Sequence, residues 1–192
     1  METENNPLSH EESLKVITDV IRKTREHFQE NSFYFILWGW LIASASFSFF
    51  LLHQYTTFRY YFLPFPILVG IGMLVSWRWY VKKKKEHTPE TYSGFFFNRL
   101  WLVLAISFPI VVFLSVSQHL VPFTYTLVLA GIGTLLSGTV MRFNALKVGG
   151  IVLFLSALLC VYIPDAYKPL VSCLAIVAGY LIPGYLLKAS HS

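Results

Sequence analysis

The sequence predicts an all-α, polytopic membrane protein with six transmembrane helices in three hairpins, preceded by a cytoplasmic amphipathic helix. Hydrophobic residue types make up 55% of the 192 residues and charged types only 13%, about half of the usual charged share of a soluble domain. The charges gather near residues 1–32 and 82–99. Five long stretches carry none: residues 31–58, 60–77, 100–141, 148–164 and 169–187. A water-soluble domain needs charged side chains on every surface element, so this pattern excludes one.

The uncharged stretches have the lengths of membrane spans, because about 20 helical residues cross a hydrocarbon core of ~30 Å. The stretch at residues 100–141 is long enough for two spans, and the polar residues Ser117, Gln118 and His119 divide it. The shortest predicted span, the fifth, begins near Gly149 and Gly150. We therefore expect six helices, at residues 33–53, 62–81, 99–117, 122–141, 147–163 and 169–187.

The basic residues predict the orientation of these spans. If the N-terminus is cytoplasmic, that side receives all 15 lysines and arginines except Arg59 and Lys168. Cytoplasmic loops of membrane proteins carry such an excess, so both termini are expected in the cytoplasm. Aromatic residues that favour membrane interfaces agree with this. The tryptophans fall toward the predicted inner ends and several tyrosines toward the outer ends: Trp38, Trp40, Trp77, Trp79 and Trp101 against Tyr55, Tyr60, Tyr61, Tyr162 and Tyr167.

The N-terminal segment is expected to form an amphipathic helix. Residues 9–12 match a capping box, with Ser9 at the N-cap and Glu12 three positions later. A stripe spaced alternately by three and four residues follows: Leu14, Ile17, Ile21, Thr24 and Phe28. The stripe must be buried against something. Its own bundle, a second copy, the groove of a partner protein and the membrane surface are the alternatives.

The loop after the second predicted span is strongly basic. Lys82, Lys83, Lys84 and Lys85 follow one another, and each lysine close to an anionic membrane surface contributes about 1 kcal/mol to binding. We expect these four side chains to contact lipid headgroups. Their position beside a span argues against a nucleic-acid partner.

Small residues predict where helices touch. Ala130, Thr134 and Gly138 are spaced by four in the fourth predicted helix, as are Gly133 and Ser137, and Ala175 and Gly179 repeat this spacing in the sixth. In lipid such faces let helices approach closely, because apolar burial alone does not favour a neighbouring helix over a lipid tail. The spacing fits a contact within the chain or between two copies.

Two further features concern the helices themselves. Pro109 and Pro183 lie inside predicted spans, where proline frees a backbone carbonyl and can kink the helix. Residues 69–76 resemble residues 130–137, because each segment contains Gly-Ile-Gly and ends in serine. In the preceding helices, Leu37-Trp38 resembles Leu100-Trp101. This similarity indicates a repeated hairpin, although any hairpin with prolines at its loops and small residues at its contacts gives a similar pattern.

Catalytic and metal-binding patterns are not found in the sequence. No charged residue falls near the middle of a predicted span, where coupled transporters and proton relays generally need one. His53, His119 and Asp165 lie at outer helix ends without a recognised ligand spacing, so we expect neither a metal nor another cofactor. Cys160 and Cys173 lie at similar depth, and we expect two unpaired thiols rather than a disulfide. A cavity lined by hydroxyls is the only route to an enzyme: Ser44, Ser48, Ser107, Thr134 and Ser137.

Several phrases resemble small, uncharacterised bacterial multi-pass proteins. They are residues 12–17, 32–40, 149–151 and 180–188, which contain Glu12-Ser13-Leu14, Phe35-Ile36-Leu37-Trp38, Gly149-Gly150-Ile151 and Ile182-Pro183-Gly184. The resemblance covers most of the chain in scattered pieces. It implies a six-helix protein of a bacterial inner membrane and no particular activity.

These patterns predict three regions: a cytoplasmic helix at residues 1–31, a membrane domain at 32–188 and a cytoplasmic tail at 189–192. The expected function is that of a non-enzymatic regulatory or scaffolding subunit that acts through helix contacts. A partner-binding surface is then expected at Leu14, Ile17, Ile21 and Phe28. The expected partners of the protein are membrane lipids and either a cytoplasmic protein or a second copy of the chain. The alternative is a small transporter or channel for an uncharged or apolar solute, built around Gly131, Gly133, Pro109 and Pro183.

Overall fold

The computed structural model describes the backbone of residues 10–56, 60–84 and 92–190. Within these ranges it also describes the side chains, except those of residues 10–31, 83–84 and 92–93. Every regular element in the described part of the chain is helical. The elements are α1 (His10–Tyr55), α2 (Pro64–Lys84), α3 (Tyr92–Ser117), α4 (Phe123–Val140), α5 (Asn144–Tyr162), η1 (Asp165–Tyr167), α6 (Lys168–Ile176), η2 (Val177–Leu181) and α7 (Ile182–Ala189). The predicted all-α class is confirmed.

Among the residues that the structure describes, five helical segments are long and apolar enough to cross a membrane: Ser32–Tyr55, Gly94–Ser117, Phe123–Val140, Asn144–Tyr162 and Asp165–Ala189. The helix expected at residues 62–81 is present as α2, but it is not among these five. Its hydropathy is lowered by prolines at its start and by Trp77, Arg78, Trp79 and Tyr80 at its end. Six spans are therefore not established by length and composition alone.

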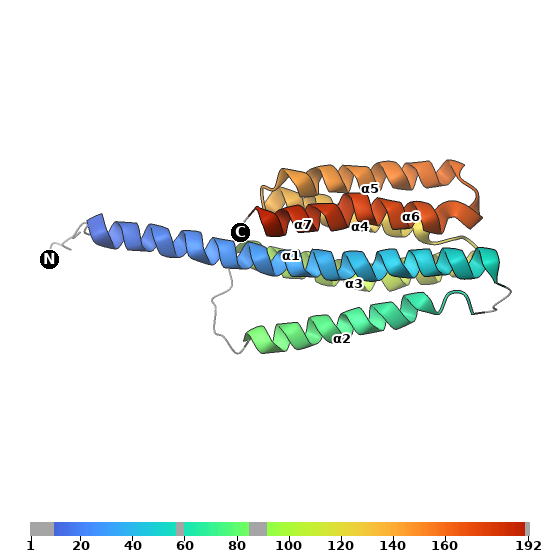
Figure 1. The fold of residues 1–192 in the computed structure, drawn as a ribbon, viewed down its shortest axis with the longest axis horizontal. Helices are drawn as coiled ribbons and strands as arrows, with labels where there is room; N and C mark the ends of the chain where they lie inside the picture. The colour runs from blue at the N-terminus through green and yellow to red at the C-terminus, as the bar shows by residue number, and fades with distance from the viewer. Residues whose placement is uncertain (1–9, 57–59, 85–91, 191–192) are drawn as a thin grey trace.

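The first helix is much longer than expected. The sequence predicted an amphipathic helix before residue 32 and a separate span at 33–53, whereas α1 continues from His10 to Tyr55 over 46 residues. No proline or glycine occurs between residues 10 and 38 to interrupt it. Figure 1 shows that the N-terminal part of α1 extends well past the ends of the other helices.

The remaining helices form an elongated bundle around α1. This helix packs against α2 on one side and against α6, η2 and α7 on the other, while α4 packs between α3 and α5. Within the bundle α2 is the outermost helix, and it lies against α1 (Figure 1). The largest fully buried side chains lie where these helices meet: Phe35, Leu127, Leu146, Leu153 and Leu187.

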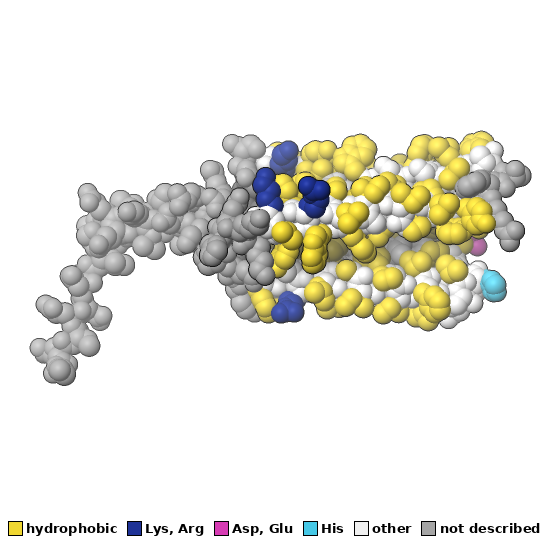
Figure 2. Space-filling model, turned by 90° about the horizontal axis from the view of Figure 1, so that it is seen from below, with side chains coloured by type: hydrophobic (Ala, Val, Ile, Leu, Met, Phe, Trp, Pro, Cys, Tyr) yellow, Lys and Arg dark blue, Asp and Glu magenta, His cyan; other side chains and the backbone are white. Residues whose placement is uncertain are grey.

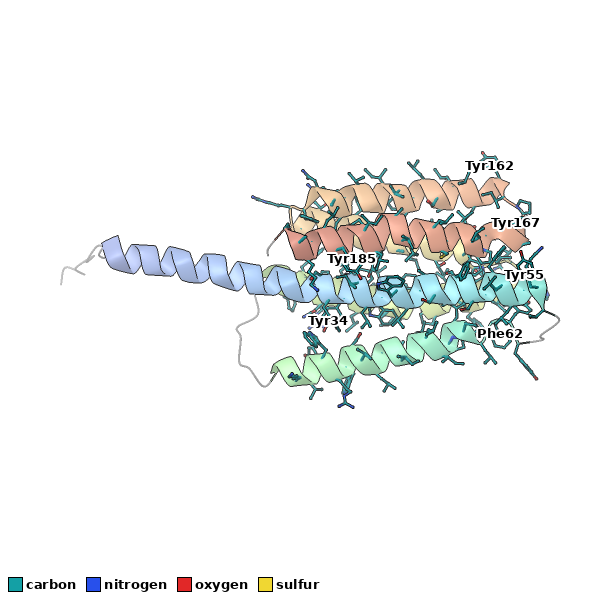
Figure 3. The ribbon with its side chains drawn as sticks, viewed as in Figure 1. Tyr34, Tyr55, Phe62, Tyr162, Tyr167 and Tyr185 are labelled. Carbon is teal, nitrogen blue, oxygen red and sulfur yellow. The ribbon has the colours of Figure 1, made fainter. Side chains whose placement is uncertain are left out.

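The two ends of the bundle differ in charge. Figure 2 shows lysine and arginine side chains gathered toward the end from which α1 extends, and acidic and histidine side chains at the opposite end. The described basic residues of α2, α3, the α4–α5 turn, α5 and α7 are Arg78, Lys82, Arg99, Arg142, Lys147 and Lys188, whereas Lys168 begins α6 and pairs with Asp165. Tyr55, Tyr162 and Tyr167 lie at the other end (Figure 3). This is the distribution expected from the sequence.

Candidate functional site

The small residues of α4 lie at contacts with both neighbouring helices. A Cβ atom built on Gly133 would lie 2.6 Å from Leu104 Cδ1 of α3, and one on Gly138 would lie 2.7 Å from the backbone nitrogen of Lys147 at the start of α5. Ala130, Thr134 and Ser137 are buried as well. The small side chains of α4 therefore allow it to lie close to α3 on one face and to α5 on the other.

Two adjacent glycines of α5 contact two different helices. A Cβ atom on Gly150 would lie 2.7 to 2.9 Å from Leu135 of α4, including its backbone nitrogen and Cα. A Cβ atom on Gly149 would collide with the carbonyl oxygen of Gly179, and one on Gly179 would lie 2.6 Å from the carbonyl oxygen of Gly149. This reciprocal approach brings Cα–H groups against carbonyl oxygens across the helix pair. From the sequence, Gly149 and Gly150 are expected only at the start of a span, and neither contact is predicted.

The contact between α1 and the C-terminal helices also depends on glycine. A Cβ atom on Gly39 would lie 2.9 Å from Leu181, and one on Gly184 would lie 3.0 Å from Phe35. Ala175, from the predicted pair in the sixth span, is buried in α6. The sequence analysis did not single out Gly39 or assign a packing role to Gly184, although both glycines stand in otherwise apolar helices.

An aromatic cluster joins α1, α3 and η2 near the basic end. The ring of Phe35 lies 4.8 Å from that of Tyr180, 5.9 Å from that of Trp101 and 6.1 Å from that of Phe97. Such tilted and edge-on arrangements are the favoured geometries of aromatic pairs. Phe35 and Tyr180 were not predicted as core residues, because an apolar helix in lipid gives no periodic signal for its buried side.

Buried hydroxyls in α4 are satisfied locally. Trp101 Nε1 donates a hydrogen bond to Ser137 Oγ at 3.2 Å, and Ser137 Oγ donates to the Gly133 carbonyl at 2.6 Å. Thr134 Oγ1 donates to the Ala130 carbonyl at 2.8 Å, and Ser107 Oγ donates to the Val103 carbonyl. These three hydroxyls, from the five expected around an enzymatic cavity, therefore hydrogen-bond to their own helices.

The same kind of packing contact occurs within each of the first two hairpins. In α2, a Cβ atom on Gly72 would lie 2.8 Å from Leu41 and 3.2 Å from the Trp38 ring. In α4, a Cβ atom on Gly133 would lie 2.6 Å from Leu104 and 3.3 Å from the Trp101 ring. In each contact the second glycine of the Gly-Ile-Gly sequence packs against a tryptophan of the preceding helix. It also packs against the leucine three positions after that tryptophan. The similarity noticed in the sequence thus corresponds to one recurring contact.

The C-terminal span contains an irregular turn. Residues Val177–Leu181 form a π-helix in which the Ile182 N–H donates to the Val177 carbonyl. Pro183 follows and has no N–H to offer the Gly179 carbonyl four residues earlier, and this is the carbonyl that lies against Gly149. Pro109, by contrast, lies on an exposed side of α3. Proline therefore accompanies a backbone irregularity in the C-terminal helical segment.

The remaining predicted site residues are distributed as follows. Leu14, Ile17, Ile21 and Phe28 belong to the α1 backbone, but their side chains lie outside the described residues. Lys82 is exposed near the end of α2, the side chains of Lys83 and Lys84 are outside the described residues, and so is Lys85 as a whole. Their proposed contacts with a partner or with lipid remain predictions.

Potential metal ligands are not brought together in the described part of the chain. No group of three His, Cys, Asp or Glu side chains there is placed to hold a metal ion. Asp165 instead pairs with Lys168, with 2.6 Å between Oδ1 and Nζ, at an open hollow also lined by Leu120 and Tyr125. Cys160 and Cys173 are both free thiols.

Comparisons of the chain with protein-family models, with curated proteins and with solved structures each find no match. The resemblance to bacterial multi-pass proteins is therefore supported only at a coarser level. The chain has several helices that are long and apolar enough to span a membrane.

Proposed function

We propose that the chain is an integral membrane protein with six spans and both termini in the cytoplasm. We further propose that it acts through helix contacts as a non-enzymatic regulatory or scaffolding subunit. The span that this proposal adds to the five candidates described above is α2. Its 21 residues extend over about 30 Å, the thickness of a hydrocarbon core. Trp77, Trp79 and Tyr80 lower its hydropathy but favour the interface in which a span ends. The basic end of the bundle (Figure 2) is then the cytoplasmic end.

The observation that carries the proposed function is the continuity of α1. Residues 10–31 extend the first span by 22 helical residues without a break, which corresponds to about 33 Å beyond the membrane. The apolar stripe Leu14, Ile17, Ile21 and Phe28 falls on this N-terminal part of α1. We propose that a cytoplasmic protein covers the stripe by helix-in-groove binding.

A function through helix contacts also agrees with the positions of the glycines and prolines. Of the four residues considered for a solute pathway, Gly131 and Gly133 pack on neighbouring helices and Pro109 is exposed on the outside of α3. Pro183 is buried, with its Cγ beside Gly149. The second candidate function, transport of an uncharged or apolar solute, is favoured only by the π-helix beside Pro183, since such turns are frequent at functional sites. Solute flux in proteoliposomes would support it.

The proposed function is tested with the full-length protein in its native membrane. We expect Ile17→Glu with Ile21→Glu to lower the amount of co-purified cytoplasmic partner at least about tenfold, because a carboxylate would be buried in an apolar interface. Thr18→Glu with Gln29→Glu adds the same charge beside the stripe and should leave binding unchanged. Deletion of residues 1–30 should abolish binding while membrane insertion persists. Unchanged association after this deletion would overturn the proposal.

We also propose a cellular location. Several spans with a strong excess of basic residues on one side fit the inner membrane of a bacterium, which is what the resemblance described above implies. Lys82, Lys83, Lys84 and Lys85 would then lie among the anionic headgroups of the cytoplasmic leaflet.

A further inference from the structure

A hollow of about 190 Å³ opens at the end of the bundle opposite the basic end. It lies where the connection between α3 and α4, the first turn of α4, the end of α5 and the start of α6 come together. Pockets for drug-sized ligands enclose about 300–1,000 Å³, so this hollow is large enough only for a smaller chemical group. In the topology proposed above it lies at the outer membrane interface, at the same end as Tyr162 and Tyr167 (Figure 3).

The hollow contains two opposite charges side by side. Lys168 Nζ lies 2.6 Å from Asp165 Oδ1, and the Lys168 side chain is 17% exposed whereas that of Asp165 is 67% exposed. The ammonium therefore lies on the sheltered side of the hollow and the carboxylate on the water side. The pair engages one carboxylate oxygen and one ammonium hydrogen, so Asp165 Oδ2 and two hydrogens of Lys168 Nζ are left for a ligand.

The rest of the lining combines hydroxyl groups with apolar side chains. Thr124 and Tyr125 each contribute a hydroxyl that can donate a hydrogen bond to an anion. Leu120 and Val161 border the hollow and are 45% and 64% exposed, so their apolar surfaces face lipid. Charged and hydroxyl groups beside exposed apolar side chains match the boundary between the headgroups and the acyl chains of a bilayer.

We infer that this hollow binds the headgroup of a phospholipid that carries a phosphate and a primary ammonium, an ethanolamine phosphate. Lys168 and the hydroxyls of Thr124 and Tyr125 bind the phosphate, and Asp165 binds the ammonium. In such a lipid the phosphate lies next to the glycerol and the ammonium lies farther toward water. The sheltered lysine and the exposed aspartate stand in the same order, and the acyl chains continue along Leu120 and Val161.

The two charges also select among headgroups. A headgroup with only negative charge is attracted by Lys168 but repelled by Asp165. A choline headgroup has a quaternary ammonium without an N–H, whereas a primary ammonium donates a charge-assisted hydrogen bond to Asp165 Oδ2. Soluble ethanolamine phosphate has the same charges, but it has no acyl chain for the apolar border. This binding requires that the bundle lies in a membrane, and it depends neither on α2 as a span nor on the N-terminal partner site.

Native mass spectrometry of the full-length protein in detergent tests the site. The probes are phospholipids with identical acyl chains and an ethanolamine, choline or glycerol headgroup, added in equal amounts. We expect the first bound molecule to be the ethanolamine lipid about tenfold more often than the choline lipid. Asp165→Asn should remove most of this preference, and Lys168→Gln should weaken the first binding event for all three lipids. Equal binding of the ethanolamine and choline lipids, or an unchanged preference in Asp165→Asn, would overturn the inference.

Two further variants separate lipid binding from the structural effect of the ion pair. Lys147→Gln is the control, because it removes one partly buried lysine from the opposite end of α5 and should leave the tenfold preference unchanged. Asp165→Lys with Lys168→Asp keeps two opposite charges but places the carboxylate where the phosphate binds. Its thermal stability without lipid should stay the same while the preference is lost. A retained preference in this variant would show that the pair has only a structural role.

A competition experiment distinguishes the lipid from a soluble ligand. Ethanolamine phosphate without acyl chains, added at the same concentration as the bound ethanolamine lipid, should not displace it. Displacement at this concentration would assign the hollow to a soluble molecule and contradict lipid binding. Deletion of residues 1–30 should leave the preference for the ethanolamine lipid intact, so the lipid site and the N-terminal partner site fail independently.

Discussion

At Gly149 and Gly179 the absence of a side chain determines how closely α5 and the C-terminal helix can approach. Each residue has the carbonyl oxygen of the other where its own Cβ would be. Dispersion and weak Cα–H contacts at this distance replace what the hydrophobic effect supplies in soluble proteins, since apolar surface gains nothing by leaving lipid. The stability of this crossing therefore depends on two hydrogen atoms in place of methyl groups.

Alanine substitutions at two glycines should have opposite effects. Gly149→Ala forces α5 away from η2, and we expect it to destabilise the protein by about 1–3 kcal/mol, the usual cost of overpacking. Gly70→Ala adds a methyl group in open space and improves helix propensity, so it should be neutral or stabilising by up to about 1 kcal/mol. Thermal unfolding of the detergent-solubilised monomers measures both. Equal destabilisation by the two variants would contradict the packing described for Gly149.

Sequence analysis at the residue scale found the small residues of α4, because their spacing by four is visible without a structure. It did not find the contacts of Gly39 or Gly149. A single glycine in an apolar helix has the same sequence signature whether it contacts another helix or faces open space, and Gly70 and Gly72 show both outcomes within three residues. Only the positions of the neighbouring helices separate these cases.

The ends of α3 and α4 show how the elements are joined. Both end in a Schellman motif: the Leu120 N–H donates to the Ser115 carbonyl and the Phe143 N–H to the Gly138 carbonyl. The residue in the left-handed conformation is His119 in the first, with φ of 58°, and Arg142 in the second, with φ of 52°. Glycine is preferred at this position, because a Cβ there costs about 1–2 kcal/mol.

Relieving the strain at the α4–α5 turn should therefore stabilise the protein. We expect Arg142→Gly to be about 1 kcal/mol more stable than Arg142→Ala, since both variants remove the charge and only the first removes the Cβ. Thermal unfolding in detergent gives the comparison. If the two variants unfold at the same temperature, the left-handed conformation at residue 142 contributes no strain.

The helices themselves could be predicted from the sequence, whereas their packing could not. Uncharged stretches located α3, α4 and α5 to within a few residues, apart from an earlier start of α3. The boundary expected before residue 32 is absent, because a change from polar to apolar composition does not interrupt a helix. In water, an amphipathic stripe would have indicated which side of each helix is buried, but helices that are apolar all round carry no such stripe.

At the scale of the whole molecule, charge and aromatic residues divide the bundle into two ends. Basic side chains gather at the end from which α1 extends (Figure 2), and Tyr55, Tyr162 and Tyr167 at the other (Figure 3). The sequence predicted this division correctly, since it follows from the alternation of loops. In the proposed topology these ends are the cytoplasmic and outer surfaces.

Cysteine labelling of intact cells tests that topology. In the chain with Cys160→Ala and Cys173→Ala, Tyr162→Cys replaces a side chain that is 86% exposed and should react with a membrane-impermeant maleimide added outside. Lys188→Cys, near the C-terminus at the basic end, should react only after the membrane is opened. Reaction of both cysteines from the same side would show that the number of spans after α5 is different.

The unbroken course of α1 has a mechanical consequence. Because α1 is continuous, its N-terminal end cannot rotate or tilt without also moving the surface that Phe35 and Gly39 present to α7 and η2. A protein bound to the N-terminal turns of α1 would therefore hold a rigid helix whose C-terminal part lies within the bundle. Inserting a flexible pair of glycines near residue 31 would uncouple the N-terminal part of α1 from the part that lies within the bundle.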